Sequence, residues 1–166
     1  MEALVQWFSE NLGRFVSPEA VIFIISMIPI LELRGGLLAA SLLKVSMTRA
    51  IPICIIGNIV PIPFILLFLT RIFSMLKKTR LFRPLVEKLE NRAMKKSETI
   101  QKYEFLGLLL FVGVPLPGTG AWTGSLIATL LELDVKKASL AIFLGILMAT
   151  VIMTVVSYGV VGNLVH

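Results

Sequence analysis

The sequence predicts an all-α integral membrane protein with two inverted repeats, each a re-entrant helical hairpin followed by a transmembrane helix, and with amphipathic interfacial helices. Composition is the first reason: 57% of the 166 residues are hydrophobic and 16% are charged, whereas about a quarter of a soluble domain is charged. The second is the succession of nearly uncharged runs, each about as long as a spanning helix of ~20 residues. The third is that proline and glycine interrupt two apolar stretches at matching places, at 29–36 and 115–124.

Residues 1–16 form the first expected element, an interfacial helix. Their apolar side chains recur at helical spacing among polar ones, which is typical of a helix lying in the membrane surface. The segment lacks the basic beginning of a cleaved signal peptide. The apolar positions are Leu4, Trp7, Phe8, Leu12 and Phe15.

The two halves of the chain align without a gap when the first is shifted by 88 residues. Pro29 then meets Pro117, and Gly36 meets Gly124. Each half contains an apolar arm, a Pro/Gly interruption, a second apolar arm, a short polar turn and one long apolar run. Internal repeats of this kind are a common architecture of secondary transporters.

Each interruption is expected to be the tip of a re-entrant hairpin. The arms hold about ten residues, which as helix reach about 15 Å, half of a ~30 Å hydrocarbon core. Backbone at such a tip is tolerated only where protein or water satisfies it. The alternative is a single broken helix that crosses once. Lysine and arginine counts on the two sides favour the re-entrant arrangement by a small margin.

One membrane domain is therefore expected, divided into four parts. They are the interfacial helix 1–16, repeat 1 at 17–76, a basic amphipathic linker at 77–104, and repeat 2 at 105–166. The linker carries nine basic and four acidic residues. A basic excess between spans marks the cytoplasmic side, so a multi-pass protein of the inner (plasma) membrane is predicted. Anionic lipid headgroups, rather than nucleic acid, are the expected partner of these charges.

The first tip contains two ionisable residues in the sequence ELRGG. A charge at membrane depth costs about 2.5–3.5 kcal/mol and normally faces a partner or water. Arg34, with open N–H groups where Gly35 and Gly36 turn the backbone, would bind an anion. Glu32 is the candidate proton carrier, because burial disfavours the charged form of a carboxyl group. The alternative is a structural Glu32–Arg34 network that pins the two tips together.

The second tip carries no charge but offers hydroxyls, an indole and flexible backbone. Proline removes a donor and breaks the helix, and glycine permits close approach. The alternative is a plain helix break with a packed tryptophan. Asn58 is a supporting candidate, because it interrupts the first long run. The substrate-binding candidates of this tip are Pro117, Gly118, Thr119, Gly120, Trp122 and Thr123.

Catalysis by this chain is not expected. The single cysteine, Cys54, lies in an apolar run, and the single histidine, His166, is the last residue. No metal-ligand cluster and no nucleophile–base set is visible in the sequence, so we expect no metal, no cofactor and no enzymatic activity.

The segments ILELRGGLLAA and PLPGTGAWTGSLIA resemble the two signature segments of the small multidrug export protein family, and the resemblance covers essentially the whole chain. That family is regarded as a distant relative of the DedA/SNARE-associated (VTT) membrane proteins. The DedA kinship implies paired re-entrant hairpins that face each other from opposite leaflets, and lipid movement that is often proton-linked. DedA proteins place acidic and arginine residues around their hairpins, parts that Glu32 and Arg34 would take here. The second hairpin departs from that pattern, because it has no matching charge.

The leading functional hypothesis is a transporter or lipid translocase that moves an anionic lipid or small amphipathic substrate between the two tips. Arg34 would hold the anion and Glu32 would couple a proton. One alternative is a proton-coupled exporter of small amphipathic cations, with Glu32 as the cation's partner. The other is a membrane scaffold that transports nothing. Four membrane segments make a thin shell around a pathway, which is compatible with a homodimer.

Overall fold

The structure is a computed structural model that describes residues 17–80, 82–95 and 98–161. Every regular element within these ranges is a helix, which confirms the predicted all-α class. The interfacial helix expected over residues 1–16 lies outside the described residues, and so does His166.

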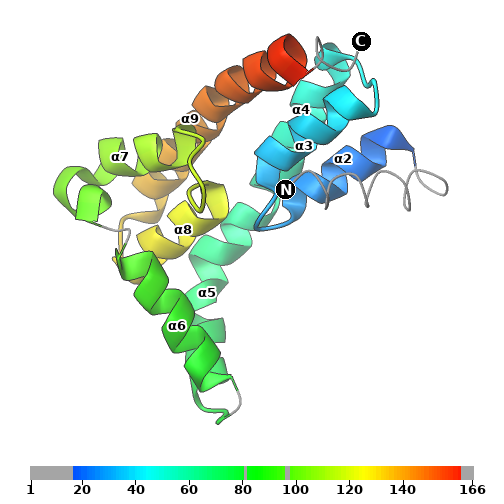
Figure 1. Cartoon of the computed structure of the whole chain (residues 1–166). Helices are drawn as coiled ribbons and strands as arrows, with labels where there is room; N and C mark the ends of the chain where they lie inside the picture. Colours follow the sequence, from blue (N-terminus) through cyan, green and yellow to red (C-terminus); the bar gives the residue numbers. More distant parts are fainter. Residues whose placement is uncertain (1–16, 81, 96–97, 162–166) are drawn as a thin grey trace.

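The helices follow one another through short connections (Figure 1). Three helices are followed by a long helix, a further single helix, a second set of three helices and a short π-helix that continues the last of them. In order they are α2 (Pro18–Met27), α3 (Glu32–Leu42), α4 (Met47–Ile59), α5 (Pro61–Lys77), α6 (Arg83–Lys95), α7 (Glu98–Gly113), α8 (Ala121–Leu130), α9 (Val135–Thr154) and η1 (Val155–Val161).

Two helices among the described residues are long and apolar enough to cross a membrane. One is Met47–Leu69, which joins α4 to the first part of α5, and the other is Val135–Gly159. Only 33% of the most apolar stretch of each is buried inside the protein, which leaves most of the surface for lipid. Helices α2 and α8 have 10 residues each, so each reaches about 15 Å, half of the ~30 Å core.

The short helices are arranged as two hairpins, α2–α3 and α7–α8. The first turn is tight: the backbone N–H of Glu32 donates to the carbonyl of Ile28 at 2.8 Å. The second connection is longer and contains Pro115 and Pro117. Helix α7 is kinked at Glu104, where φ is 35° and ψ is −97°, and its apolar part is Tyr103–Gly113. Along the long helices, α2 packs on α4 and α7 packs on α9.

The first turn is shorter than the sequence predicts. The tip was expected near 29–36, but α3 already begins at Glu32. Gly35 is helical, and its N–H donates to the carbonyl of Leu31 at 2.7 Å. The expectation that Gly35 and Gly36 turn the backbone and leave N–H groups open is therefore wrong. Gly36 serves close packing instead, because a Cβ there would lie 2.9 Å from the Cys54 sulfur.

The turn after the second arm is built in the same way in both halves of the chain. Lys44 and Glu132, 88 residues apart, both have positive φ, at 57° and 53°. The hydrogen bonds around them correspond one for one at the same offset. The N–H of Val45 donates to the carbonyl of Ala40 at 2.9 Å, and that of Leu133 to that of Ala128 at 3.0 Å.

Glycines at matching positions bring the long helices close to the first arms. A Cβ at Gly57 of α4 would lie 2.7 Å from the backbone oxygen of Phe23 in α2. A Cβ at Gly145 of α9 would lie 2.9 Å from the backbone oxygen of Leu109 in α7. Both contacts are with backbone, which cannot rotate away as a side chain can. The sequence repeat thus reflects a repeated helix contact.

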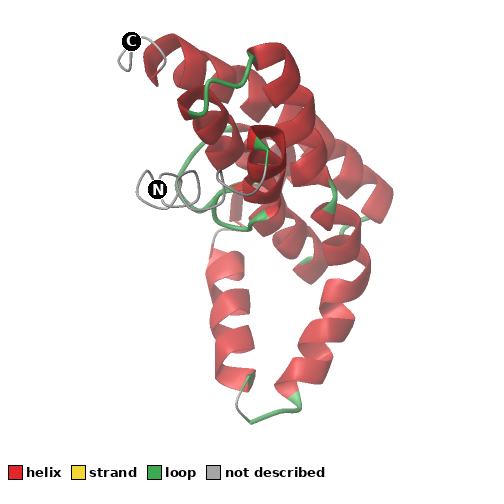
Figure 2. Cartoon of the chain, turned by 90° about the vertical axis from the view of Figure 1, so that its right-hand side faces the viewer, coloured by secondary structure: helices red, strands yellow, loops and turns green. Residues whose placement is uncertain are grey.

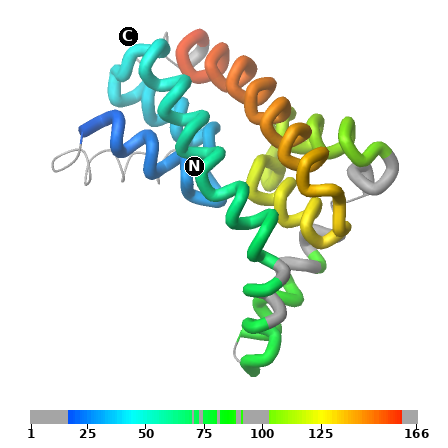
Figure 3. The backbone as a smooth tube through the Cα atoms, turned by 180° about the vertical axis from the view of Figure 1, so that it is seen from behind, coloured from blue at the N-terminus to red at the C-terminus, as the bar shows by residue number. Residues whose placement is uncertain are grey.

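The interruption expected at Asn58 is slight. Val60 joins α4 to α5 with helical angles, φ −50° and ψ −46°, and its N–H donates to the carbonyl of Ile56 at 3.0 Å. In Figure 3 the two helices form one continuous rod, coloured cyan to green. Pro61 is tolerated here because it is the first residue of α5.

The last part of α5 and α6 extend together away from the other helices, as Figure 2 shows, and form what we call the basic arm. The end of α5, the connection and α6 carry exposed lysine and arginine side chains. Arg83 and Glu87 of α6 form an exposed ion pair at 2.8 Å. Val86 is buried with 1% of its surface exposed, so α6 is amphipathic.

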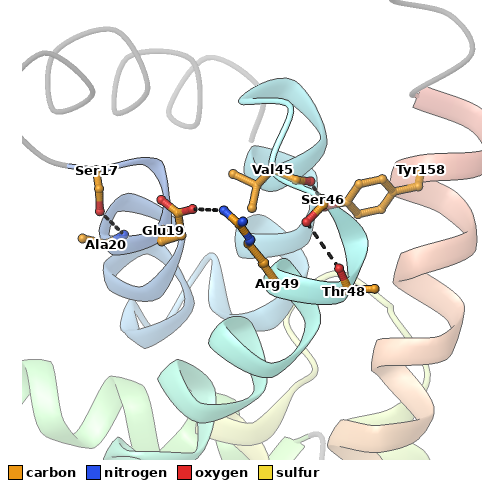
Figure 4. A network of polar contacts seen from close by, with 8 residues as sticks. All are labelled: Ser17, Glu19, Ala20, Val45, Ser46, Thr48, Arg49 and Tyr158. Carbon is orange, nitrogen blue, oxygen red and sulfur yellow. Dashed lines mark hydrogen bonds and ion pairs between the residues drawn. The ribbon is translucent and has the colours of Figure 1, made fainter.

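The π-helix η1, which continues α9, docks on the α3–α4 turn (Figure 4). The Tyr158 hydroxyl donates to the carbonyl of Val45 at 2.9 Å, and the Ser41 hydroxyl donates to that of Ser157 at 2.8 Å. On the other side of the turn, Arg49 of α4 pairs with Glu19 of α2 at 3.5 Å. These contacts tie the two long helices to the first hairpin.

Candidate functional site

The two hairpin tips meet each other, so that the start of α3 contacts the connection before α8 and the first turn of α8. Every side-chain contact described next joins residues more than 75 positions apart in the chain. At all but one of these contacts a side chain of one tip satisfies free backbone groups at or near a helix end of the other tip; the exception joins Arg34 to the Thr119 hydroxyl. Helix ends leave such groups unpaired unless a cap supplies partners.

Glu32 caps the beginning of α8. Its Oε2 accepts a hydrogen bond from the backbone N–H of Ala121 at 3.1 Å, and its Oε1 accepts one from the N–H of Trp122 at 3.0 Å. The residue before α8, Gly120, has no side chain that could supply a local cap. A carboxylate at this end of a helix is also favoured by the helix dipole. Glu32 is 4% exposed and has φ 50°, so it is held in a specific backbone conformation.

Arg34 caps the end of α7 and the connection that follows. Its Nη1 donates to the carbonyl of Leu116 at 2.7 Å. Its Nη2 donates to the Thr119 hydroxyl at 3.0 Å, and makes longer bonds to the carbonyls of Val114 at 3.2 Å and Val112 at 3.3 Å. A cation is favourable at the C-terminal end of a helix. The planar, forked guanidinium reaches several acceptors at once, which an ammonium cannot do.

Trp122 makes the matching contact in the opposite direction. Its Nε1 donates to the carbonyl of Met27, the last residue of α2, at 3.1 Å. Trp122 stands 88 residues after Arg34, and each donates to a carbonyl at the end of the other hairpin's first arm. The contact between the tips is therefore reciprocal, although the two residue types differ.

The structure brings Glu32, Arg34, Thr119, Gly120 and Trp122 together in one cluster. The cluster is rich in hydrogen-bond donors: the guanidinium and the indole N–H donate to carbonyls of the opposite hairpin, and the first N–H groups of α8 donate to Glu32. In the present arrangement the carboxylate of Glu32 occupies those N–H groups. An external anion can reach them only if Glu32 moves away.

The other candidates lie at different places. Pro117 and Gly118 are exposed in the second tip, and Thr123 is half-buried in the first turn of α8. Asn58 is buried in α4 with 2% exposure, and its Oδ1 has no hydrogen-bond partner within the described part of the chain. A buried unpaired amide oxygen is unusual and marks a position for mutagenesis.

A cavity of about 230 Å³ lies at the opposite end of α8 from the tips. Its lining includes carboxylates and one lysine, but the described residues contain no group of three side chains suited to hold a metal ion. The lining residues are Glu104, Phe105, Leu108, Leu131, Glu132, Leu133, Asp134, Lys137 and Ala138.

Sequence reasoning missed the main partners of the charged pair, because they are backbone groups. The carbonyls of Val112, Val114 and Leu116 carry no signature in the sequence. One signal could have pointed to them: Pro115 and Pro117 end α7 and leave its last carbonyls without donors.

The chain belongs to the family described as "Putative small multi-drug export protein", whose family model matches residues 32–152. The match begins at Glu32, includes the connection before α8 and all of the first helix of spanning length, and ends at Ile152 within the second. Membership agrees with the resemblance of the two tip segments, and the family description indicates a transporter-like role in a membrane. No curated protein and no solved structure matches this chain.

Proposed function

We propose that this protein is a membrane transporter that moves an anionic amphiphile, such as a lipid with a phosphate headgroup, between the tips of two re-entrant hairpins. The observation that carries the proposal is the position of Glu32 and Arg34. Both lie where half-length apolar helices end against one another. Ionisable residues within the hydrocarbon core mark substrate or proton pathways by default.

Inverted repeats with facing hairpins account for this arrangement. Arms of about 15 Å that enter from opposite sides of a ~30 Å core would meet near its middle. The reciprocal contacts of Arg34 and Trp122 support two equivalent units that meet tip to tip. Discontinuous helices whose ends face a site at the midplane are typical of secondary transporters. The small multidrug export family is regarded as a distant relative of the DedA proteins, and that kinship implies the same arrangement.

The chemistry of the tips favours an anionic substrate. A phosphate or carboxylate group would accept hydrogen bonds from Arg34 and from the N–H groups of Ala121 and Trp122, which now bind Glu32. Displaced Glu32 would remain as a second buried anion beside the substrate, a repulsive arrangement that protonation relieves. Glu32 is therefore the residue that would couple a proton to transport.

The basic arm sets the orientation of the proposed protein. Its lysines and arginines, between the two halves, would face the cytoplasm of the inner (plasma) membrane and contact anionic headgroups there. We expect transport without catalysis or cofactor, in a monomer or a homodimer.

Two other functions are favoured by particular observations. The described side-chain hydrogen bonds of Glu32 and Arg34 all go to the opposite tip, as a purely structural lock in a membrane scaffold would require. The family description instead favours export of small drugs. For amphipathic cations, Glu32 would be the anionic partner.

The test is lipid transfer in liposomes that contain the purified protein. Fluorescent lipids with an anionic or a zwitterionic headgroup are followed between leaflets, and efflux of a fluorescent amphipathic cation is measured in parallel. We expect transfer of the anionic lipid, with strong loss in Arg34→Lys and Glu32→Gln. Arg49→Ala is the control, because Arg49 pairs with Glu19 at the surface, away from the tips. Cation efflux without lipid transfer would establish the exporter, and no flux of either would favour the scaffold.

A further inference from the structure

The position of Gly120 explains why the second tip carries no acidic residue at the place equivalent to Glu32. Gly120 stands 88 residues after Glu32, so the two occupy the same place in the two halves. In the structure these equivalent positions lie against each other, because the carboxylate of Glu32 occupies the space beside Gly120. The two halves therefore meet at a point where only one of them can carry a side chain.

The fit between the two residues is close. A Cβ added to Gly120 would overlap Glu32 Oε2 and would lie 2.7 Å from its Cδ and 2.8 Å from its Oε1. Both residues are buried. The carboxylate cannot shift far without losing the N–H groups of Ala121 and Trp122, which hold both of its oxygens.

The backbone conformation of Gly120 also favours the contact with the Glu32 carboxylate. Its φ of 137° with ψ of −176° is a conformation that residues with a side chain rarely adopt. This conformation places the next two N–H groups, those of Ala121 and Trp122, against the carboxylate. Gly118 also has positive φ, at 75°, so the tip contains a second glycine whose replacement strains the backbone.

We propose that Gly120 is the positioning residue for Glu32. The space left by the missing side chain of Gly120, which we call the seat, holds the Glu32 carboxylate, and the carboxylate there closes the contact between the two tips. This inference rests on the proposed function, since the closed contact is the barrier of the proposed pathway. One seat holds one carboxylate, because a second acid at position 120 would require the same volume and would repel the first.

A double-mutant cycle tests the proposal. Gly120→Ala and Gly118→Ala are each made in the wild-type and the Glu32→Ala backgrounds, and thermal unfolding is measured in detergent. If Gly120 seats Glu32, Gly120→Ala lowers the midpoint strongly beside the glutamate and by less than half as much in Glu32→Ala. Gly118→Ala is the control for backbone strain, because Gly118 also has positive φ but is exposed, and it should shift the midpoint equally in both backgrounds. Equal shifts for Gly120→Ala in both backgrounds would overturn the positioning role.

A second measurement leaves Glu32 in place. In a Trp7→Phe background, Trp122 is the remaining tryptophan, and its backbone N–H binds the carboxylate. Gly120→Ala should make Trp122 fluorescence more accessible to a neutral quencher, whereas Gly118→Ala should change it little. Unchanged quenching in Gly120→Ala would contradict the proposal even where Glu32→Ala does not fold.

Lipid transfer separates this inference from the proposed function. If wild-type protein moves no lipid but the cycle shows coupling, the seat is real and the transport proposal fails. If wild-type protein moves lipid and the cycle shows no coupling, the transport proposal stands and the seat is wrong. We expect that the wild-type protein moves lipid and that the double-mutant cycle shows coupling. Gly120→Ala should then alter lipid transfer far more than Gly118→Ala.

Discussion

Replacement of Arg34 by alanine removes the guanidinium that satisfies the end of α7. Hydrogen bonds to charged groups contribute about 1.5–3 kcal/mol each. The bonds to Leu116 at 2.7 Å and to Thr119 at 3.0 Å are short enough to count fully, which gives about 3–6 kcal/mol. The longer bonds at 3.2 and 3.3 Å add little.

Part of this loss is avoided locally. In the wild-type protein the Thr119 hydroxyl already donates toward the carbonyls of Leu116 at 2.9 Å and Val114 at 3.0 Å. One of these carbonyls therefore keeps a donor when Arg34 is removed, which reduces the loss by about 1 kcal/mol. A net destabilisation of about 2–5 kcal/mol is expected, which for a chain of this length lowers the unfolding midpoint by roughly 5–15 °C.

The assay is thermal unfolding of the purified protein in detergent, followed by circular dichroism. Arg34→Lys should fall between wild type and Arg34→Ala, because lysine keeps the charge but not the fork. Arg49→Ala is the matched control: the Arg49 side chain is 73% exposed, and an exposed pair contributes about 0–1 kcal/mol. An Arg34→Ala protein that unfolds within about 2 °C of Arg49→Ala would refute the reasoning.

Three further predictions follow from the packing and the topology. In a cysteine-free background, Ser46→Cys should label from outside the cell and Lys136→Cys from inside; labelling of both from one side would mean simple crossings. Gly36→Ala should destabilise the protein, because its Cβ would overlap the Ser26 hydroxyl, and Ser26→Ala should partly restore the unfolding midpoint; no rescue would locate the clash elsewhere. Tyr158→Phe should cost about 1 kcal/mol in a chemical unfolding titration, since it loses one neutral hydrogen bond, and a loss above about 3 kcal/mol would indicate a larger role for this residue.

The helical class and the positions of the interruptions were readable from the sequence because they depend on local properties. Apolar length decides which helices can span a membrane, and two prolines close together, Pro115 and Pro117, follow the end of α7 because neither supplies the N–H that would continue the helix. The 88-residue offset was also visible, since both halves repeat the same order of arms and turns. Gly36 was recognised as special, but for the wrong reason: a glycine that turns a chain and one that packs a helix look alike in a sequence.

The sequence by itself determined that Glu32 and Arg34 lie inside an apolar stretch and need partners, because unpaired charges are costly there. Only the tertiary structure decided what those partners are. They are backbone N–H and carbonyl groups of the other hairpin, about 80–90 residues away. Backbone groups are the same for every residue type, so their availability depends on where helices end and which ends meet in space. The same holds for Gly120, whose side-chain volume is filled by a carboxylate from the opposite repeat.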